Sequence, residues 1–156
     1  MYVWITALFL VLDQAIKAYV RTIPTGQTFF TIPGFLSLTH CVNTGAAFSI
    51  LSGKTLFLAM LSVFLLGTIY VFVCREMRLT APARLALSCM IGGGVGNLLD
   101  RVLFGGVTDY VRLLFVSFPV FNLADIGITV AIAVLMVMLL TDTLEESSEE
   151  KHGSDS

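Results

Sequence analysis

Two acidic residues, Asp109 and Asp125, are the side chains of this sequence best placed to do chemistry together. They lie in the stretch Gly105–Asp125, GGVTDYVRLLFVSFPVFNLAD, which contains no other acid. The stretch begins where one long apolar run ends and finishes just inside the next. A carboxylate in the first turn of such an apolar run is costly unless it has a partner or a function. We therefore expect the two acids to converge on one water molecule.

Hydrolysis of a peptide bond is the reaction that such a pair would support. The reaction needs a base to activate water and an acid to protonate the leaving amine. Two carboxyl groups close together share one proton, so that one can serve as base while the other serves as acid. Spacing alone leaves this interpretation and a purely structural role for each acid equally open.

Other catalytic and metal-binding patterns are less favoured by the sequence. His40 is the only histidine outside the acidic C-terminal segment, and we expect a loop residue that hydrogen-bonds locally rather than a general base. The cysteines form no CxxC or Cys/His cluster, so we expect free thiols at Cys41, Cys74 and Cys89 and no zinc site. Ligation of a metal by aspartates alone stays open as the weaker alternative.

The composition is that of a polytopic membrane protein. The 156 residues are 56% hydrophobic and 13% charged, against about 25% charged in soluble domains, and the mean hydropathy is +0.90. Four apolar runs are each close to the roughly 20 residues that a bilayer requires. We predict an all-α membrane fold with one domain over residues 1–144. Its spans are predicted at about residues 2–20, 56–74, 83–104 and 122–141, the first being a retained span because it lacks a basic n-region and a cleavage site.

The segments outside the spans are expected to differ in structure. The loop Arg21–Thr55 contains an alternating run, Phe35–Val42, which predicts a small extracytoplasmic β-sheet between the first two helices. The loop Arg75–Arg84 holds three arginines, and because basic loops favour the cytoplasm, both termini are expected to be cytoplasmic. Residues 145–156, EESSEEKHGSDS, are acidic and polar, which predicts a disordered cytoplasmic tail.

Polar residues of the predicted spans fall in one layer of the membrane. The first span carries Asp13 and Lys17 four residues apart, a spacing that lets them pair on one helix face. The third span has a polar group at its C-terminal end, and the fourth has one at its start. Because the spans alternate in direction, all three groups lie near the outer face and predict a polar cavity there. The other members are Asn97, Asp100, Arg101, Asn122 and Asp125, with Asp100 expected to pair with Arg101.

The glycines of the third predicted span have two possible roles. Gly92, Gly93, Gly94 and Gly96 would allow close helix packing. They would also leave room beside the cavity for the backbone of a substrate. A phosphate loop does not fit, because no GK[ST] follows the glycines.

The chain resembles the bacterial lipoprotein signal peptidases, or signal peptidase II, a family of intramembrane aspartic peptidases. Five motifs carry the resemblance in family order, from Asp13 to Asp125. They are DQxxK at Asp13–Lys17, NxGxAF at Asn43–Phe48, GGxxGNxxDR at Gly92–Arg101, VxDY/F at Val107–Tyr110 and FNxAD at Phe121–Asp125. Gly94, where alanine is usual, is the one departure from the pattern.

The resemblance implies that Asp109 and Asp125 are the catalytic dyad. It also implies substrate binding or support of the site for a further set of residues, which are Asn43, Gly45, Asn97, Arg101, Asn122, Ala124, Asp13 and Lys17. The implied substrate is a prolipoprotein with a diacylglyceryl group on its lipobox cysteine, cut just before that cysteine. The aromatic residues of the first loop, Phe29, Phe30, Phe35 and Phe48, would lie over the site and exclude bulk water.

The resemblance also implies where the protein works and with what. It implies the bacterial cytoplasmic (inner) membrane, with the active site near the outer face, and inhibition by the cyclic peptide globomycin. We expect no cofactor, no metal and no nucleic-acid partner, and we expect a monomer in contact with membrane lipid.

Two alternatives use the same residues differently. A small proton- or ion-coupled transporter also needs buried carboxylates, but it would want polar residues across the whole membrane, and the cytoplasmic halves of the spans are nearly free of charge. A non-catalytic scaffold would not need two unpaired acids in the outer layer.

Overall fold

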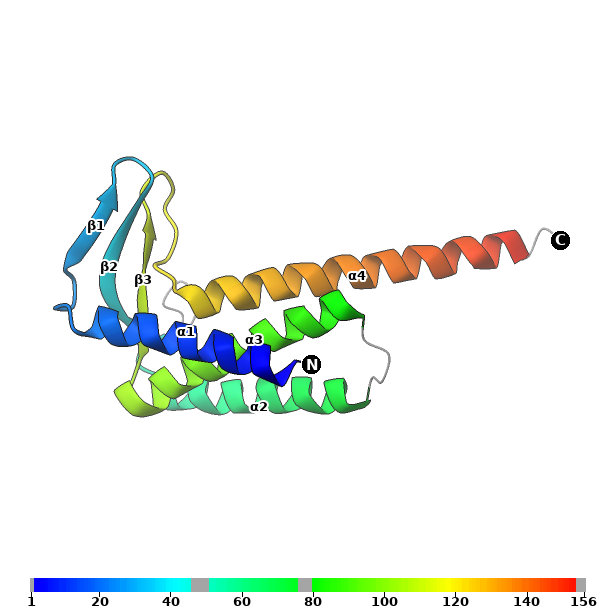
Figure 1. Ribbon diagram of the computed structural model, residues 1–156, viewed down its shortest axis with the longest axis horizontal. Helices are drawn as coiled ribbons and strands as arrows, with labels where there is room; N and C mark the ends of the chain where they lie inside the picture. Colours follow the sequence, from blue (N-terminus) through cyan, green and yellow to red (C-terminus); the bar gives the residue numbers. More distant parts are fainter. Residues whose placement is uncertain (1, 46–50, 76–79, 154–156) are drawn as a thin grey trace.

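Four helices and a three-stranded sheet make up the fold (Figure 1), seen in a computed structural model that describes residues 2–45, 51–75 and 80–153. The helices are α1 (Val3–Arg21), α2 (Thr55–Arg75), α3 (Ala81–Phe104) and α4 (Leu123–Gly153). The strands are β1 (Thr28–Ile32), β2 (Leu36–Asn43) and β3 (Val107–Leu113). Each helix begins within two residues of the start of a predicted span, so hydropathy located all four.

The sheet lies at one end of the helices, and both ends of the chain point away from it (Figure 1). Its order is β1-β2-β3 with antiparallel neighbours, so the predicted strand near Phe35–Val42 is confirmed as the central strand β2. Strand β3, which follows α3 after a turn at Gly105, was not predicted from the sequence. Gly105 has φ +74°, a left-handed conformation that ends helices and that glycine adopts without strain.

The register between β2 and β3 shifts once. Leu38 pairs with Val111, but the next pair along the ladder is Cys41 with Asp109. Three steps along β2 therefore match two along β3, which is a β-bulge. Beyond the bulge, Cys41 and Asn43 lie on the same face of the sheet as Asp109.

Helix α3 is the centre of the helical layer, because it packs against α1, α2 and α4. A Cβ added at Gly92 would come within 2.9 Å of the Thr6 carbonyl oxygen on α1. At Gly93 it would come within 2.8 Å of the Ala124 carbonyl oxygen on α4. The glycine run therefore serves close packing of the helices.

Burial is inverted relative to a soluble protein. Leu56 and Phe64 of α2 are 75% and 68% exposed, whereas Asp13, Lys17 and Asp100 are fully buried. Large apolar side chains outside and ions inside are typical of a protein surrounded by lipid. Among the described residues, α1 is the one helix that is both long and apolar enough to cross a bilayer, while the apolar parts of α2 and α4 are shorter, Thr55–Val71 and Leu123–Met138.

The C-terminal segment differs from its prediction. The backbone of α4 continues as a helix to Gly153, through most of the segment for which the sequence predicts disorder. Glutamate is a good helix former, and a helix that is already nucleated extends at little cost. Residues 154–156 lie outside the described part of the chain.

Candidate active site

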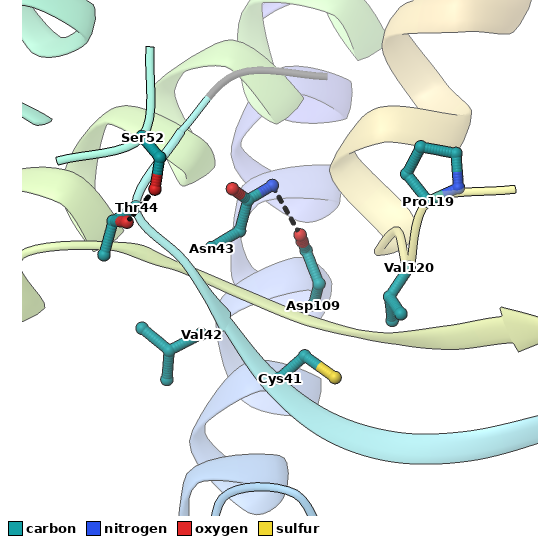
Figure 2. A pocket seen from close by; sticks show the side chains of 8 residues that line it. All are labelled: Cys41, Val42, Asn43, Thr44, Ser52, Asp109, Pro119 and Val120. Carbon is teal, nitrogen blue, oxygen red and sulfur yellow. Dashed lines mark hydrogen bonds between the residues drawn. The ribbon is translucent and has the colours of Figure 1, made fainter. Parts of the chain in front are cut away.

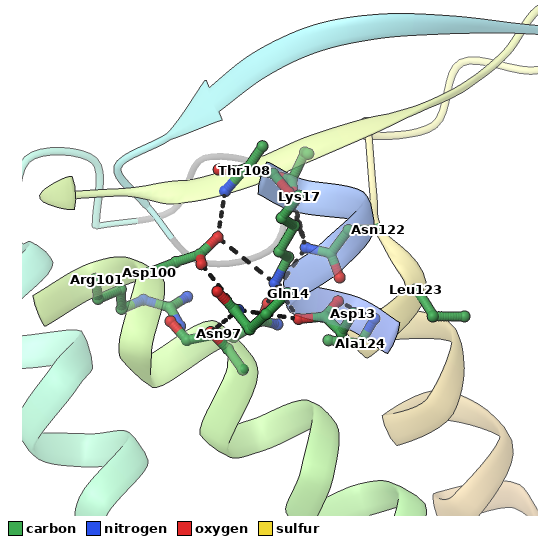
Figure 3. Close-up of polar contacts among 12 residues, drawn as sticks. Asp13, Gln14, Lys17, Asn97, Asp100, Arg101, Thr108, Asn122, Leu123 and Ala124 are labelled. Atoms are coloured by element: carbon green, nitrogen blue, oxygen red, sulfur yellow. Dashed lines mark hydrogen bonds and ion pairs between the residues drawn. The ribbon is translucent and has the colours of Figure 1, made fainter. Parts of the chain in front are cut away.

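A buried ion cluster joins α1 to α3 below the sheet (Figure 3). Lys17 Nζ lies 2.9 Å from Asp13 Oδ2 and 3.5 Å from Asp100 Oδ2, and it donates a hydrogen bond of 2.7 Å to Asn97 Oδ1. The predicted pairing of Asp13 with Lys17 is confirmed. The predicted pairing of Asp100 with Arg101 is wrong, because Asp100 turns toward α1 and pairs with Lys17 and with Arg21, at 3.3 Å.

The two acids of this cluster also hold the segments that carry the candidate catalytic residues. Asp100 Oδ2 accepts the backbone N–H of Thr108, the residue before Asp109, at 2.9 Å. Asp13 Oδ1 accepts the backbone N–H of Ala124, the residue before Asp125, at 3.1 Å. The cluster thus ties β3 and the first turn of α4 to the same buried charges. Gln14, which donates to Asp13, to Asp100 and to the Gly96 carbonyl, completes it.

Asp109 is 2% exposed and accepts one amide hydrogen bond on each carboxyl oxygen. Asn122 Nδ2 donates to Oδ1 at 2.7 Å, and Asn43 Nδ2 donates to Oδ2 at 3.0 Å. The pKa of Asp109 is raised to about 7, mainly by burial and also by the nearby charge of Asp125, while the two amide donors oppose the rise. Asp109 is therefore able to hold a proton near neutral pH.

Asp125 sits in the first turn of α4 and is held by donors from two directions. Asn97 Nδ2 donates to its Oδ1 at 2.8 Å, and the backbone N–H of Asn122 donates to its Oδ2 at 3.2 Å. Hydrogen bonds from N–H groups and a place at a helix N-terminus both favour a negative charge. Both carboxyl oxygens of Asp125 are therefore fixed by N–H donors.

Both acids line one cavity of about 490 Å³. The cavity runs from the β2 and β3 ends, past the two acids, and along α4. Arg101, which the sequence analysis also selected, lines it, and its Nη1 donates to the Asn97 carbonyl at 3.3 Å. Its further lining residues are Asn43, Asn97, Val107, Phe118, Pro119, Val120, Phe121, Ile126, Ile128, Thr129 and Val130.

A second, smaller chamber of about 200 Å³ lies on the sheet side of Asp109 (Figure 2). Its walls are Cys41, Val42 and Asn43 of β2, together with Thr44, Ser52, Asp109, Pro119 and Val120. The two chambers are neighbours and meet at a shared wall, which consists of Asn43, Asp109, Pro119 and Val120.

Every residue selected from the sequence takes part in this arrangement. Gly45 donates its N–H to Asn43 Oδ1 at 2.9 Å and so orients the amide that reaches Asp109. Ala124 is fully buried against Gly93. The rest of the NxGxAF motif, residues 46–48, lies outside the described part of the chain.

The predicted aromatic cover is only partly described. Phe29 packs edge-on against Tyr19, and Phe35 stacks on Phe115, at ring-centroid distances of 6.2 and 5.6 Å. Neither these residues nor Phe30 lines the two chambers, whereas Phe118 and Phe121 line the larger one. Phe48 lies outside the described residues.

Two residues near the site differ from their predictions or were missed. His40 is a buried strand residue, not a loop residue, although its Nδ1 makes the expected local hydrogen bond, to the Ile23 carbonyl oxygen at 2.6 Å.

Tyr110 was missed, and its position next to Asp109 in the sequence is the signal that could have found it. Its hydroxyl oxygen accepts the Leu123 N–H at 3.1 Å, and burial raises the pKa of Tyr110 to about 12. The hydroxyl thus stays protonated while it tethers β3 to α4.

Comparison with known proteins agrees with this arrangement. The family described as Signal peptidase (SPase) II matches residues 5–141. The chain belongs to the signal peptidase II family. It is 37% identical to the lipoprotein signal peptidase of Enterococcus faecalis, over 98% of this chain and 95% of the relative. It is 39% identical to that of Streptococcus pneumoniae, over 90% and 92%.

The solved structures agree as well. A bacterial membrane enzyme solved by the in meso method at 2.3 Å resolution has a TM-score of 0.84 and 33% identity, and the match covers 90% of this chain and 87% of that one. Family membership makes the chain a membrane-bound peptidase that removes signal peptides from prolipoproteins. The transporter alternative finds no support in these comparisons.

Proposed function

We propose that Asp109 and Asp125 are the catalytic dyad of a membrane-embedded aspartic endopeptidase, which cuts prolipoproteins just before the diacylglyceryl-modified cysteine. One observation carries the proposal. Both carboxyl groups line a single cavity, and Asn122 donates a hydrogen bond to each of them, through its side chain to Asp109 and through its backbone to Asp125. Two acids held by one residue at one cavity suit the sharing of a proton.

The two environments suggest a division of labour. Asp125, with N–H donors on both oxygens, takes a proton from a water molecule as that water attacks the carbonyl carbon of the scissile amide. Asp109, protonated at the start, donates a hydrogen bond to the carbonyl oxygen. The proton held by Asp125 then moves to the amide nitrogen, and the carbon–nitrogen bond breaks. The products are a carboxyl-ended signal peptide and a lipid-modified cysteine with a free amine.

The amides and the cation around the dyad have positioning roles in this proposal. Asn43, Asn97 and Asn122 fix the carboxyl oxygens at 2.7 to 3.0 Å through their side chains. The guanidinium of Arg101 lines the cavity and would bind a carbonyl group of the substrate backbone. Asp13 and Lys17 act only through the segments they hold. Fixed dipoles of this kind lower the barrier because they need not reorganise during the reaction.

The placement in the membrane is also a proposal. All four helices would span the bacterial cytoplasmic membrane as one domain over residues 1–144, with both termini cytoplasmic and the sheet on the outer face. The inverted burial and the location of both chain ends opposite the sheet support it (Figure 1). The enzyme would act as a monomer, with lipid against its exposed apolar side chains, and globomycin would inhibit it.

The test is cleavage of a diacylglyceryl-modified precursor peptide by Asp109→Asn and Asp125→Asn enzymes. General acid–base groups contribute about 10²–10⁴-fold in rate, and each variant should lose activity on this scale while still binding the peptide and remaining monodisperse in detergent. Near-normal cleavage by either variant would refute the dyad. A wild-type enzyme that failed to cut the lipid-modified peptide would refute the activity itself.

A further inference from the structure

The two chambers that meet at Asp109 differ in chemistry. The larger one extends along α4 between Ile126, Thr129 and Val130, of which Ile126 and Val130 are 43% and 57% exposed on the apolar surface of the helices. It is therefore open to the region that lipid would occupy. The smaller one is built on the sheet, and its outer wall carries Thr44 and Ser52, whose hydroxyl oxygens lie 3.1 Å apart. Ser52 is exposed, so this wall of the chamber reaches the surface of the molecule.

The substrate of the proposed reaction has the same asymmetry about the cut. On one side is the apolar signal segment, and the acyl chains of the cysteine also belong in the bilayer. The cysteine is the first residue of the mature protein, and the residues that follow it have to leave the membrane. A bond cut at Asp109 would therefore place apolar material in the larger chamber and the mature chain in the smaller one.

We propose that the smaller chamber binds the residues that follow the lipid-modified cysteine, and that Cys41 restricts their side chains to small ones. This inference rests on the proposed function and names a specificity site within it. Sites for drug-sized ligands measure about 300–1,000 Å³. A chamber of about 200 Å³ has room for only one or two small residues.

Cys41 is the wall residue best placed to set this limit. It pairs directly with Asp109 in the β2–β3 ladder, so that both side chains lie on one face of the sheet. Directly opposed residues have Cβ atoms about 4.5–5.5 Å apart, so a larger side chain at position 41 would fill the space beside the carboxyl. Figure 2 shows Cys41 and Asp109 side by side on this wall. The Cys41 thiol is half-buried, and its one described polar contact is Arg112 Nη2 at 3.9 Å.

The test compares two lipid-modified peptides in detergent micelles. The short peptide ends at the modified cysteine as an amide, and the long peptide continues with several residues, the first being glycine, serine, leucine or tryptophan. For wild-type enzyme, kcat/KM for the long peptide is divided by kcat/KM for the short one. This ratio should fall as the side chain of the first residue after the cysteine becomes larger. Cys41→Phe should lower the ratio for the serine peptide at least tenfold, an energy of about 1.4 kcal/mol. Cys41→Ala should raise the ratio for the leucine peptide, and Cys89→Ala, which alters a thiol outside both chambers, should leave every ratio as in wild type.

A second measurement covers the case in which Cys41→Phe fails to fold. In Asp109→Asn enzyme, the long serine peptide should slow alkylation of Cys41 by N-ethylmaleimide, and the short peptide should not. The inference would be overturned if the kcat/KM ratios did not change with the size of the residue after the cysteine or with substitution at position 41. Equal protection of Cys41 by both peptides would also overturn it. Either result would leave the proposed function intact. Failure of the wild-type enzyme to cut either peptide would overturn both.

Discussion

Asn122 and Asp125 exchange two hydrogen bonds across the first turn of α4. The side-chain oxygen of Asn122 accepts the backbone N–H of Asp125 at 3.0 Å, and the carboxylate of Asp125 accepts the backbone N–H of Asn122 at 3.2 Å. This is a capping box, in which the N-cap residue and the residue three positions later satisfy each other's free N–H groups. In this protein the second member of the box is a proposed catalytic acid, so the start of the helix and the site depend on the same pair.

The capping role and the catalytic role of Asn122 can be separated by substitution. Asn122→Ala should lose about 1 kcal/mol of stability through the cap and should also lose activity, because the donor to Asp109 at 2.7 Å disappears. Asn122→Ser should retain most of the stability, since serine is a good N-cap, but it should lose activity to a similar degree. Thermal unfolding in detergent and kcat for the lipid-modified peptide would measure the two effects. Full activity in Asn122→Ser would show that the donor to Asp109 is dispensable.

Activity should fall on the alkaline side of neutrality. Asp109 must hold its proton to act as the acid, and its pKa is raised to about 7, so the active form declines as the pH rises through that value. The amide of Asn43 lowers this pKa, and Asn43→Ala should therefore move the alkaline limb of the kcat profile to higher pH, in addition to lowering kcat. A limb that stays in place or moves to lower pH would contradict the proposed protonation of Asp109.

The same raised pKa makes a prediction about stability. Because folding raises the pKa of Asp109 from 3.8, the folded protein binds this proton more tightly than the unfolded chain does. The resulting stabilisation is complete below pH 3.8 and is lost as the pH rises to about 7. The asparagine of Asp109→Asn cannot ionise. The melting temperature of this variant should therefore rise relative to that of wild type as the pH increases from 5 to 8. A constant difference across this range would indicate that Asp109 titrates as an ordinary carboxyl.

Lys17 should contribute strongly to the stability of the fold, because it is fully buried between two acids. Removing one partner of a buried ion pair costs about 3–5 kcal/mol, since the remaining charge is left uncompensated. Lys17→Met should therefore unfold at a much lower temperature than wild type. The exposed Lys54 offers a matched control, and Lys54→Met should have little effect on the melting temperature. The double variant Asp13→Asn/Lys17→Met should lose less stability than the sum of the two single variants.

Glycine substitutions test how closely α3 and α4 must pack. A Cβ at Gly93 would lie 2.8 Å from the Ala124 carbonyl oxygen and 3.2 Å from its Cα, and backbone atoms can move only with the helix. Gly93→Ala should push α4 away from α3, displace Asp125 and lower both stability and kcat. Gly67 on α2 has no neighbour within 4 Å of such a Cβ, so Gly67→Ala should be neutral or stabilise by up to about 1 kcal/mol. Equal effects of the two substitutions would argue against the packing role.

Much of this fold could be predicted because a membrane protein shows its helices as apolar runs. The starts of α1 to α4 and the central strand β2 all follow from patterns that extend over several residues. The partners of Asp100 could not be predicted, since spacing along one helix identifies neighbours on that helix, whereas Lys17 and Arg21 come from another. The capping box was visible in the sequence as an asparagine three residues before an aspartate at the start of an apolar run. Tyr110 was harder to find, because its role depends on where β3 meets α4.

The β-bulge between Leu38 and Cys41 determines which side chains reach Asp109. Side chains alternate across a strand, so deleting Val42, which lies beyond the bulge, would reverse the orientation of the residues that follow it in β2. Thr44 would then occupy the place of Asn43, and the amide would point away from the carboxyl. The number of residues between Cys41 and Asn43 should therefore be the same in every active variant of the enzyme, whereas a deletion within the bulge would leave Cys41 opposite Asp109.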